Sequence, residues 1–452
     1  MGLIGFRCDG GIAVGAGHVA RCLSLARAFT AGGDDVVFCG DYDGLASDLL
    51  ADAGMARVGG LEIPTDVDAV IVDSYDVDAS QLADALPSVP LAAIVDLPDA
   101  SPGRGVTVLT YHAVDTTADL AGPNYALVDP RFVAARGERG FASALVTFGG
   151  SAAGAAAARI AAGIASDARL AVVEPAVGLV DVVGAIDVAL SGAGLTPYEL
   201  ACAGVPSVIV AIVENQAPVA AGLSRAGAVI AVSATAGLDS KELAAALERL
   251  REPELRAALT AAGPAVVDGY GAARARDALT ATFAGRPPSR VLRYRPVTAA
   301  DADLLLQWRN DRETLAASRA QQPVSAREHA DWVSLVIADR ARSLFVVEDD
   351  TGPAATLRFD GGTAEAEISV TVAPERRGEG IASRILREGS ELHLAAHLSV
   401  ETVVAELRPD NKRSIAACER AGFTPAGEGS TPGLLRLSLD REALRRTSTI
   451  YP

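Results

Sequence analysis

A histidine stands directly after a Gly-Ala-Gly sequence near the N-terminus, where a helical pattern begins. The stretch reads FRCDGGIAVGAGHVARCLSLARAF over residues 6–29, and His18 is one of only five histidines in the chain. The first amides of a helix are unpaired and lie at the positive end of its dipole, so a helix start attracts anions. An imidazole there can take or give a proton near neutral pH. The residues alone leave two interpretations open: His18 transfers protons beside a bound anion, or it is an ordinary polar residue at a helix start.

Two further glycine-containing turns follow apolar runs that are typical of buried strands. The first is VTFGGS (146–151), and the second is SGAGLTPYE (191–199), which leads into a helix. Ligands of open α/β sheets bind at the carboxyl ends of the strands. We expect the amides of the second turn to hold a pyrophosphate and its glutamate to accept hydrogen bonds from a ribose. The predicted contacts are Gly149, Gly150, Gly194, Leu195, Thr196 and Glu199.

A fourth segment combines a strand pattern, an Arg/Gly turn and a helix pattern. It reads ISVTVAPERRGEGIASRILREG over residues 368–389. The spacing Arg377-x-x-Gly380-x-Ala382 places small residues and successive N–H groups at a helix start, where a pyrophosphate can approach. This segment is predicted to bind a second phosphate-containing ligand.

Composition narrows the class of protein. The formal net charge is −17, and no basic stripe is present, which argues against a nucleic-acid-binding surface. The five cysteines (8, 22, 39, 202 and 418) lack metal-like spacing, so we expect reduced thiols and no metal. Asp-x-Asp triplets at 41–43, 66–68 and 76–78 are read as solvated or helix-capping residues. No uninterrupted apolar run of about 18 residues occurs, so we expect a cytoplasmic protein without membrane contact.

The helices and strands that must position these residues follow two different sequence patterns, one before and one after about residue 284. Up to residue 284, short apolar runs alternate with Ala- and Leu-rich helical stretches, which predicts a doubly wound α/β fold with two parallel sheets, in lobes 1–140 and 141–284. Residues 285–291 (GRPPSRV) read as a linker, and residues 292–452 read as a mixed α/β domain. The runs predicted as parallel strands are 36–39, 69–73, 91–96, 144–148, 187–191 and 206–213.

The first 284 residues resemble the UDP-sugar hydrolase of pseudaminic acid biosynthesis, a relative of the two-lobed GT-B glycosyltransferases. The resemblance implies release of UDP from a UDP-linked diacetamido-trideoxy sugar, with His18, Asp9 and Tyr75 as catalytic residues and His18 activating water. Ser74 and Leu195 depart from the family pattern, and GLTPYE is closer to the MurG-type glycosyltransferases. The positions that match the motifs are Arg7, Asp9, Gly15, Gly17, His18, Arg21, Asp73, Tyr75, Glu199, Glu214, Asn215 and Gln216.

The C-terminal part resembles the GNAT N-acetyltransferases in segment 368–389 and in ELRPDNKRSIAACERAGF (406–423). The resemblance implies that acetyl-CoA is the cosubstrate and that Trp308 and Asn310 lie beside the acceptor. Cys418 stands where many members carry the tyrosine that protonates the CoA thiolate, so the acid is either Cys418 or water. The candidate bases for the amine are Glu348, Glu365, Glu367 and His329. The implied acetyl-CoA contacts are Val372, Arg377, Gly378, Gly380, Ala382 and Asn411.

Together the two resemblances imply a bifunctional nucleotide-sugar enzyme. One half would N-acetylate a UDP-4-amino-4,6-dideoxy sugar with acetyl-CoA, and the other would hydrolyse the UDP-diacetamido product to free sugar and UDP. Two alternatives stay open: a MurG-like glycosyltransferase fused to an acetyltransferase, and a nucleotide-sugar-binding scaffold in which only the acetyltransferase is active.

Overall fold

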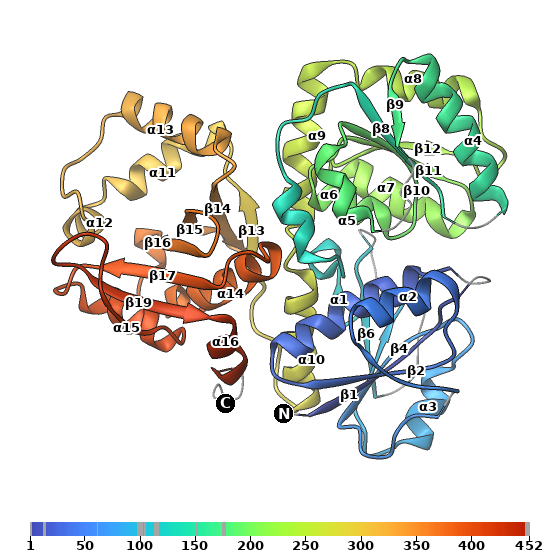
Figure 1. Ribbon diagram of the computed structural model, residues 1–452, viewed down its shortest axis with the longest axis horizontal. Helices are drawn as coiled ribbons and strands as arrows, with labels where there is room; N and C mark the ends of the chain where they lie inside the picture. The colour runs from blue at the N-terminus through green and yellow to red at the C-terminus, as the bar shows by residue number, and fades with distance from the viewer. Residues whose placement is uncertain are drawn as a thin grey trace. The chain divides into compact units, whose positions relative to one another are not determined.

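The computed structural model describes residues 2–11, 15–60, 62–96, 103, 105–112, 117–149, 152–173 and 178–447. The chain divides into two compact units, Met1–Ser289 and Arg290–Pro452 (Figure 1). Among the helices of the described ranges, none combines the length and apolar character that crossing a membrane requires. The same ranges contain no group of three or more His, Cys, Asp or Glu side chains placed to hold a metal ion.

The first unit contains, within the described residues, a seven-stranded parallel sheet in the order β3-β2-β1-β4-β5-β6-β7. Its central strands at residues 69–73 and 91–94 are short, fully buried runs of almost only Val, Ile, Leu and Ala, as expected for a parallel sheet. The order reverses at β1, because β2 lies on one side of it and β4 on the other. The strands are β1 (Leu3–Cys8), β2 (Asp35–Cys39), β3 (Ala56–Val58), β4 (Ala69–Asp73), β5 (Leu91–Ile94), β6 (Val106–Thr110) and β7 (Leu120–Ala121).

A second parallel sheet follows in the same unit, with the order β12-β11-β10-β8-β9 in the described part of the chain. Here the order reverses at β8, which lies between β9 and β10. The apolar side chains of these strands pack with the flanking helices into one buried core. The strands are β8 (Ser143–Thr147), β9 (Ala171–Val173), β10 (Val188–Gly192), β11 (Ser207–Ala211) and β12 (Ile230–Ser233).

The helices of this unit connect the strands. The last helix, α10, follows the second sheet in the chain but packs against α1, the helix that follows the first strand of the first sheet. The α-helices are α1 (Gly17–Ala31), α2 (Gly44–Asp52), α3 (Ala79–Ala85), α4 (Ala152–Asp167), α5 (Leu179–Val182), α6 (Thr196–Cys202), α7 (Ala217–Arg225), α8 (Ser240–Arg249), α9 (Pro253–Val266) and α10 (Gly271–Phe283). The 3₁₀ helices are η1 (Pro123–Tyr125), η2 (Pro130–Ala135), η3 (Val183–Ala185) and η4 (Glu214–Gln216).

The second unit is built on a mixed sheet in the order β13-β14-β15-β16-β17-β19-β18, counted over its described residues. All neighbours are antiparallel except β16 and β17. The strands are β13 (Arg293–Pro296), β14 (Arg342–Asp349), β15 (Gly352–Asp360), β16 (Glu365–Val372), β17 (Thr402–Leu407), β18 (Thr424–Glu428) and β19 (Leu435–Asp440). The helices are η5 (Ala299–Asp301), α11 (Ala302–Arg309), α12 (Arg312–Ala317), α13 (Ala326–Ala338), η6 (Pro374–Arg376), α14 (Ile381–Ala396), α15 (Lys412–Arg420) and α16 (Arg441–Thr447).

The two parallel strands β16 and β17 separate after a short paired stretch. Their registered pairs run from Glu365 with Thr402 to Glu367 with Val404, although β16 continues to Val372. On its other side β16 stays paired with β15 up to Val372. The sheet is therefore open on one side of β16 just before the turn at 374–380.

The six runs predicted as parallel strands each coincide with a strand of the two parallel sheets, β2, β4, β5, β8, β10 and β11. The expectation of parallel α/β sheets is confirmed. The observed strand ends differ from the predicted ones by one or two residues in several places. Some polar or glycine residues belong to a strand, and some apolar residues next to a strand lie outside it.

Candidate functional site

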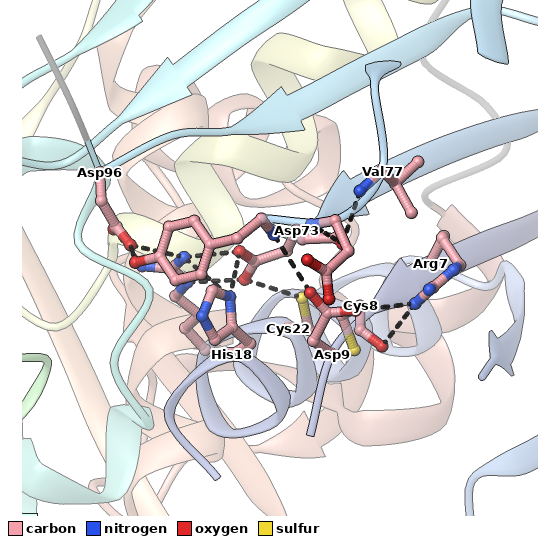
Figure 2. Close-up of polar contacts among 12 residues, drawn as sticks. Arg7, Cys8, Asp9, His18, Cys22, Asp73, Val77 and Asp96 are labelled. Atoms are coloured by element: carbon pink, nitrogen blue, oxygen red, sulfur yellow. Dashed lines mark hydrogen bonds and ion pairs between the residues drawn. The ribbon is translucent and has the colours of Figure 1, made fainter. Parts of the chain in front are cut away.

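A cluster of polar side chains lies where β1, β4 and β5 end, at the point where the order of the first sheet reverses (Figure 2). The carboxyl ends of parallel strands share one edge of the sheet, and ligands bind where the order reverses. Asp73 is the last residue of β4, and Asp9 follows β1 directly. Helix α1 begins nearby with Gly17 and contributes His18 and Arg21. We call His18, Arg21, Asp73 and Asp96 the Asp73 cluster.

Asp73 holds both α1 residues of the cluster. Its Oδ1 lies 2.7 Å from His18 Nδ1, and its two oxygens accept from Arg21 Nη2 at 2.5 Å and Nε at 2.6 Å. Figure 2 shows the His18 and Asp73 side chains directed toward one another. Because an ionised carboxylate only accepts hydrogen bonds, we assign the proton of the neutral imidazole to Nδ1. Among the described residues Nε2 has no hydrogen-bond partner, so its lone pair is left for a ligand or water.

Burial and charge oppose one another at Asp73. Its side chain is 1% exposed, which disfavours the charged form. The neighbouring Arg21 guanidinium and the hydrogen bonds from Arg21 and His18 outweigh burial and hold the pKa of Asp73 below its ordinary value. Asp73 is therefore an ionised carboxylate at neutral pH, which suits it to orient an imidazole.

Asp96, which follows β5, forms the other end of the cluster. It accepts from Arg21 Nη1 at 2.5 Å and from the Tyr75 hydroxyl at 2.5 Å. Burial raises the pKa of Asp96, but the charge of Arg21 and several hydrogen bonds lower it by more than burial raises it. The net pKa is below the ordinary value, so Asp96 is ionised. The Tyr75 ring is 62% exposed and meets His18 edge-on at 4.8 Å between centroids. Tyr75 thus presents an open surface beside the imidazole.

Arg7 and Asp9 support the same edge of the sheet. Arg7 Nη1 donates to Asp9 Oδ1 at 3.1 Å, and Asp9 Oδ2 accepts from the Tyr75 backbone amide at 3.1 Å. Asp9 therefore ties the end of β1 to the turn after β4. In that turn Ser74 Oγ accepts from the amides of Asp76 and Val77.

The predicted glycines of the first unit border open space. A Cβ atom added at Gly15, Gly17, Gly149 or Gly194 would meet nothing within 4 Å, and Gly15 and Gly149 have positive φ of 88° and 73°. Gly150 lies outside the described residues. Open space over a glycine turn fits the close approach of a ligand to the backbone.

The predicted nucleotide contacts of the second sheet lie around the starts of α6 and η4. Leu195 precedes α6, Thr196 begins it, and Glu199 is one turn in. Loss of water around its carboxyl group and the charge of Asp129 raise the pKa of Glu199 to about 7, against a hydrogen bond from Thr196. A glutamate of this kind both accepts and donates hydrogen bonds near neutral pH.

Helix η4 carries the other predicted contacts. Glu214 and Asn215 are exposed. The Gln216 side-chain oxygen accepts from the Ile212 amide at 3.0 Å, so it holds the turn after β11. Its amide nitrogen is the part of this side chain left for a ligand.

Sequence reasoning missed Asp96, Tyr111, His112 and Tyr198. Tyr111 OH accepts from Arg21 Nη1 at 2.7 Å, and His112 contacts both Asp96 and Tyr198. The available signal was position, because Asp96 and His112 follow strands just as Asp73 ends one. A position after a strand predicts a site residue only when the order of the strands in the sheet is known.

In the second unit the Arg/Gly turn forms a second candidate site beside the gap between β16 and β17. Gly378 and Gly380 have positive φ of 88° and 76°, and a Cβ atom at either would meet nothing within 4 Å. Among the described residues, no backbone hydrogen bond engages the amides of Arg377, Gly378, Glu379 or Gly380. Unpaired amides below open space, at the start of the long helix α14, fit an anion such as a pyrophosphate.

The arginines of this turn are held by carboxylates. Arg377 Nη2 donates to Asp311 Oδ2 at 2.5 Å and to Thr314 Oγ1 at 2.9 Å. Arg376 Nη2 donates to Asp349, whose side chain is fully buried. The structure therefore gives both guanidinium groups a role in shaping the turn, and Asp311 and Asp349 are supporting residues that the sequence did not indicate.

The remaining predicted acetyl-CoA contacts flank this turn. Val372 ends β16, and Ala382 is the second residue of α14. Asn411 caps α15, with its Oδ1 accepting from the Ser414 amide at 3.2 Å. Cys418 is 2% exposed, and burial, together with the charge of Glu419, raises the pKa of its thiol to about 12.

The predicted acceptor residues are engaged within the fold. Trp308 is 2% exposed and lies in the core. The Asn310 side chain bonds to both backbone groups of Val324, donating to its oxygen at 2.8 Å and accepting from its amide at 2.9 Å. Both residues therefore shape the α11 region, and their side chains contribute little free surface.

The four candidate bases differ in their partners. Glu348, Glu365 and Glu367 each form an ion pair with an arginine. His329 is 6% exposed, stacks on Trp332 at 5.4 Å between centroids, and its buried Nε2 has no hydrogen-bond partner in the described part of the chain. Burial and the charge of Arg309 lower its pKa, which keeps the imidazole neutral.

Comparison with known proteins assigns part of the chain to a family. Residues 292–424 match the family model described as "Acetyltransferase (GNAT) domain". No sequence among the curated proteins matches the chain.

Similar solved structures include aminoglycoside acetyltransferase AAC(6')-Ib with coenzyme A and kanamycin, at 20% identity over 35% of this chain and 99% of that chain, TM-score 0.31. A spermidine N-acetyltransferase from Vibrio cholerae with CoA and spermine is 20% identical over 34% of this chain and 97% of that chain, TM-score 0.30. Because identity and TM-score are low, the assignment rests on the family match alone. Residues 292–424 are a GNAT acetyltransferase domain.

Proposed function

We propose that the chain is a bifunctional nucleotide-sugar enzyme. In this proposal residues 292–452 transfer an acetyl group from acetyl-CoA to an amine of a UDP-4-amino-4,6-dideoxy sugar, and residues 1–284, arranged as two GT-B-like lobes, hydrolyse the acetylated UDP-sugar to free sugar and UDP. Residues 285–291 link the two parts. The family match supports the acetyltransferase half and covers its residues 292–424.

The gap beside β16 and the unpaired amides of residues 377–380 support acetyl-CoA as the cosubstrate. The amine nitrogen attacks the thioester carbonyl carbon, the C–S bond breaks, and the CoA sulfur leaves with the electron pair. The amine must lose one proton and the CoA thiolate must gain one. His329 is the base candidate with an unbonded nitrogen, whereas the three glutamates are ion-paired.

The acid of this step follows from relative acidity. An ordinary thiol such as that of CoA has a pKa of about 8.5. With its pKa raised to about 12, Cys418 is a weaker acid than the CoA thiol, so proton transfer from it is uphill. We therefore give Cys418 a packing role on α15. A thiolate of the acidity of CoA can leave without a proton donor beside it, and it takes its proton from the solvent after the C–S bond has broken.

In the hydrolase half, the observation that carries the proposal is the pairing of His18 Nδ1 with Asp73 at 2.7 Å, which leaves Nε2 unbonded among the described residues. Nε2 takes a proton from water, the water oxygen attacks the anomeric carbon, and the bond from that carbon to the phosphate oxygen breaks. UDP leaves with the electron pair. Asp73 orients the imidazole and stabilises the imidazolium as it forms, and the general-base step contributes about 10²–10⁴-fold.

The products of the two halves suggest their order. Acetylation of the amine makes a UDP-diacetamido sugar, which is the substrate that the resemblance implies for the hydrolase. A glycosyltransferase of the MurG type is the second candidate for the first 284 residues, because Leu195 and the sequence GLTPYE fit that group. The two differ in whether UDP release needs an acceptor other than water.

The test uses the purified chain with the UDP-4-amino sugar and acetyl-CoA, following free CoA and free UDP. The proposal expects CoA release, then UDP release without any added acceptor, and loss of UDP release by about 10²–10⁴-fold in His18→Asn while CoA release persists. CoA release without UDP release favours the scaffold or the glycosyltransferase. Addition of acceptor sugars separates those two.

A further inference from the structure

Two neighbouring residues after β6 contact helix α6 of the second sheet. The Tyr198 hydroxyl lies 3.0 Å from His112 Nδ1, and the Tyr198 ring meets the Tyr111 ring edge-on at 5.0 Å. The three side chains are almost fully buried, at 0%, 6% and 1% exposure for Tyr198, His112 and Tyr111. A buried polar contact of this kind fixes orientation, because its groups have no water as an alternative partner.

The same two residues also contact the Asp73 cluster. Tyr111 OH accepts from Arg21 Nη1 at 2.7 Å, and His112 Nε2 lies 3.4 Å from Asp96 Oδ1. Since Asp96 only accepts, we assign a proton to His112 Nε2, which leaves Nδ1 to accept from the Tyr198 hydroxyl. One continuous series of buried and partly buried contacts thus joins α6 to His18, through Tyr198, His112, Asp96, Arg21 and Asp73.

Because of its position on α6, Tyr198 is the end of this series that lies beside the proposed nucleotide contacts. Tyr198 lies between Thr196, at the helix start, and Glu199, the two residues of α6 proposed above to contact the nucleotide. A ligand that fixes Thr196 and Glu199 also fixes the ring and hydroxyl of Tyr198. The hydroxyl in turn restricts the orientation of the His112 ring. His112 restricts Asp96, and Asp96 restricts the Arg21 guanidinium.

We propose that Tyr198 and His112 are positioning residues that couple nucleotide binding at α6 to the orientation of His18. The inference rests on the proposed hydrolase function. It assigns these residues no contact with the reacting atoms: they fix Arg21 and Asp96, and through Asp73 they fix the imidazole. UDP bound at α6 thereby favours the arrangement in which His18 Nε2 faces the anomeric carbon.

The kinetic test is Tyr198→Phe, which keeps the buried ring against Tyr111 and removes only the hydroxyl. We expect kcat for UDP release to fall about five- to tenfold, the effect of one buried hydrogen bond, and UDP affinity to weaken by no more than the same factor, because the coupling is reciprocal. Tyr125→Phe is the matched control, because it removes the hydroxyl of another buried tyrosine in the same unit. Wild-type kcat in Tyr198→Phe, or an equal loss in Tyr125→Phe, overturns the inference.

A second measurement does not depend on hydrolysis. The chain has five histidines, so ¹⁵N-histidine labelling gives imidazole signals that single substitutions assign. We expect UDP alone to shift the His18 and His112 signals in the wild type, and the His18 shift to be largely lost in Tyr198→Phe. A full His18 shift in that variant, or none in the wild type, overturns the inference. Failure of hydrolysis with the expected signal changes refutes the hydrolase proposal and leaves the coupling in place.

Discussion

The stability of the second unit should depend on pH through His393, a buried histidine on α14. Its side chain is 8% exposed, its ring stacks on Phe359 at 4.0 Å between centroids, and His397 lies 4.4 Å away. Within the described residues its Nε2 has no hydrogen-bond partner. The Arg441 guanidinium, bonded to the carbonyls at the end of α14, adds positive charge near that end of the helix. No acidic partner compensates a proton at this site among the contacts described here.

Burial, and secondarily the charge of His397, lowers the pKa of His393 from 6.5 to about 3. The unfolded chain therefore binds more protons than the folded chain between about pH 6.5 and pH 3, and stability falls as the pH falls through the unfolded-state pKa. From about pH 7.5 to pH 5 this one group removes about 2 kcal/mol, which is about 1.4 kcal/mol for each pH unit below 6.5. His397 and His329 also have lowered pKa values, so the wild-type slope is at least this steep.

Urea unfolding followed by tryptophan fluorescence measures this unit alone, because Trp308 and Trp332 are the only tryptophans and both belong to it. The unfolding midpoint is used rather than the intensity, since His329 stacks on Trp332. His393→Phe keeps an aromatic ring against Phe359 and cannot titrate, so its free energy of unfolding should lose about 2 kcal/mol less between the two pH values. An equal pH dependence in wild type and variant would refute the reasoning.

Three further predictions concern the two proposed sites and the division of the chain. Ala382→Glu puts a negative charge at the start of α14 and should weaken acetyl-CoA binding by about 100-fold in calorimetry, whereas Gly362→Glu, an exposed change in the same unit, should not. Glu199→Ala should weaken UDP binding by about tenfold and change kcat less, since the proposed role of Glu199 is to contact the nucleotide and not the breaking bond; an unchanged UDP affinity would argue against that role. Residues 1–284 and 291–452, expressed separately, should each melt cooperatively, and an aggregated fragment would contradict this boundary.

The local patterns of the sequence predict much of the fold and part of the site. Apolar runs such as 69–73 and 207–211 are buried parallel strands, because only strands covered on both faces consist of such residues. The opening glycines and His18 predict a helix start, and α1 begins at Gly17. These features depend on neighbours in the sequence, which pattern reasoning can evaluate.

The rest depends on contacts between distant residues. Asp96 joins the cluster because β5 lies beside β4, and strand order is not visible in one sequence. Tyr198 meets His112 across 86 positions, and Arg377 meets Asp311 across 66. The same limit explains Asn310, whose amide bonds to Val324 within the fold. The resemblance to acetyltransferases placed Asn310 beside the acceptor, and one sequence does not show that its side chain also bonds to Val324.

The charges of the Asp73 cluster connect its stability to its proposed chemistry. Asp73 and Asp96 are both ionised and share one guanidinium, Arg21, so the three groups carry one net negative charge. Arg21 satisfies both carboxylates, which is why two buried acids remain charged so close together. Asp73 also contacts His18 Nδ1, so a proton on the imidazole would lie beside this negative charge. In the proposed hydrolysis this negative charge would stabilise the imidazolium that forms as His18 activates water, which is the condition for electrostatic stabilisation of a transition state.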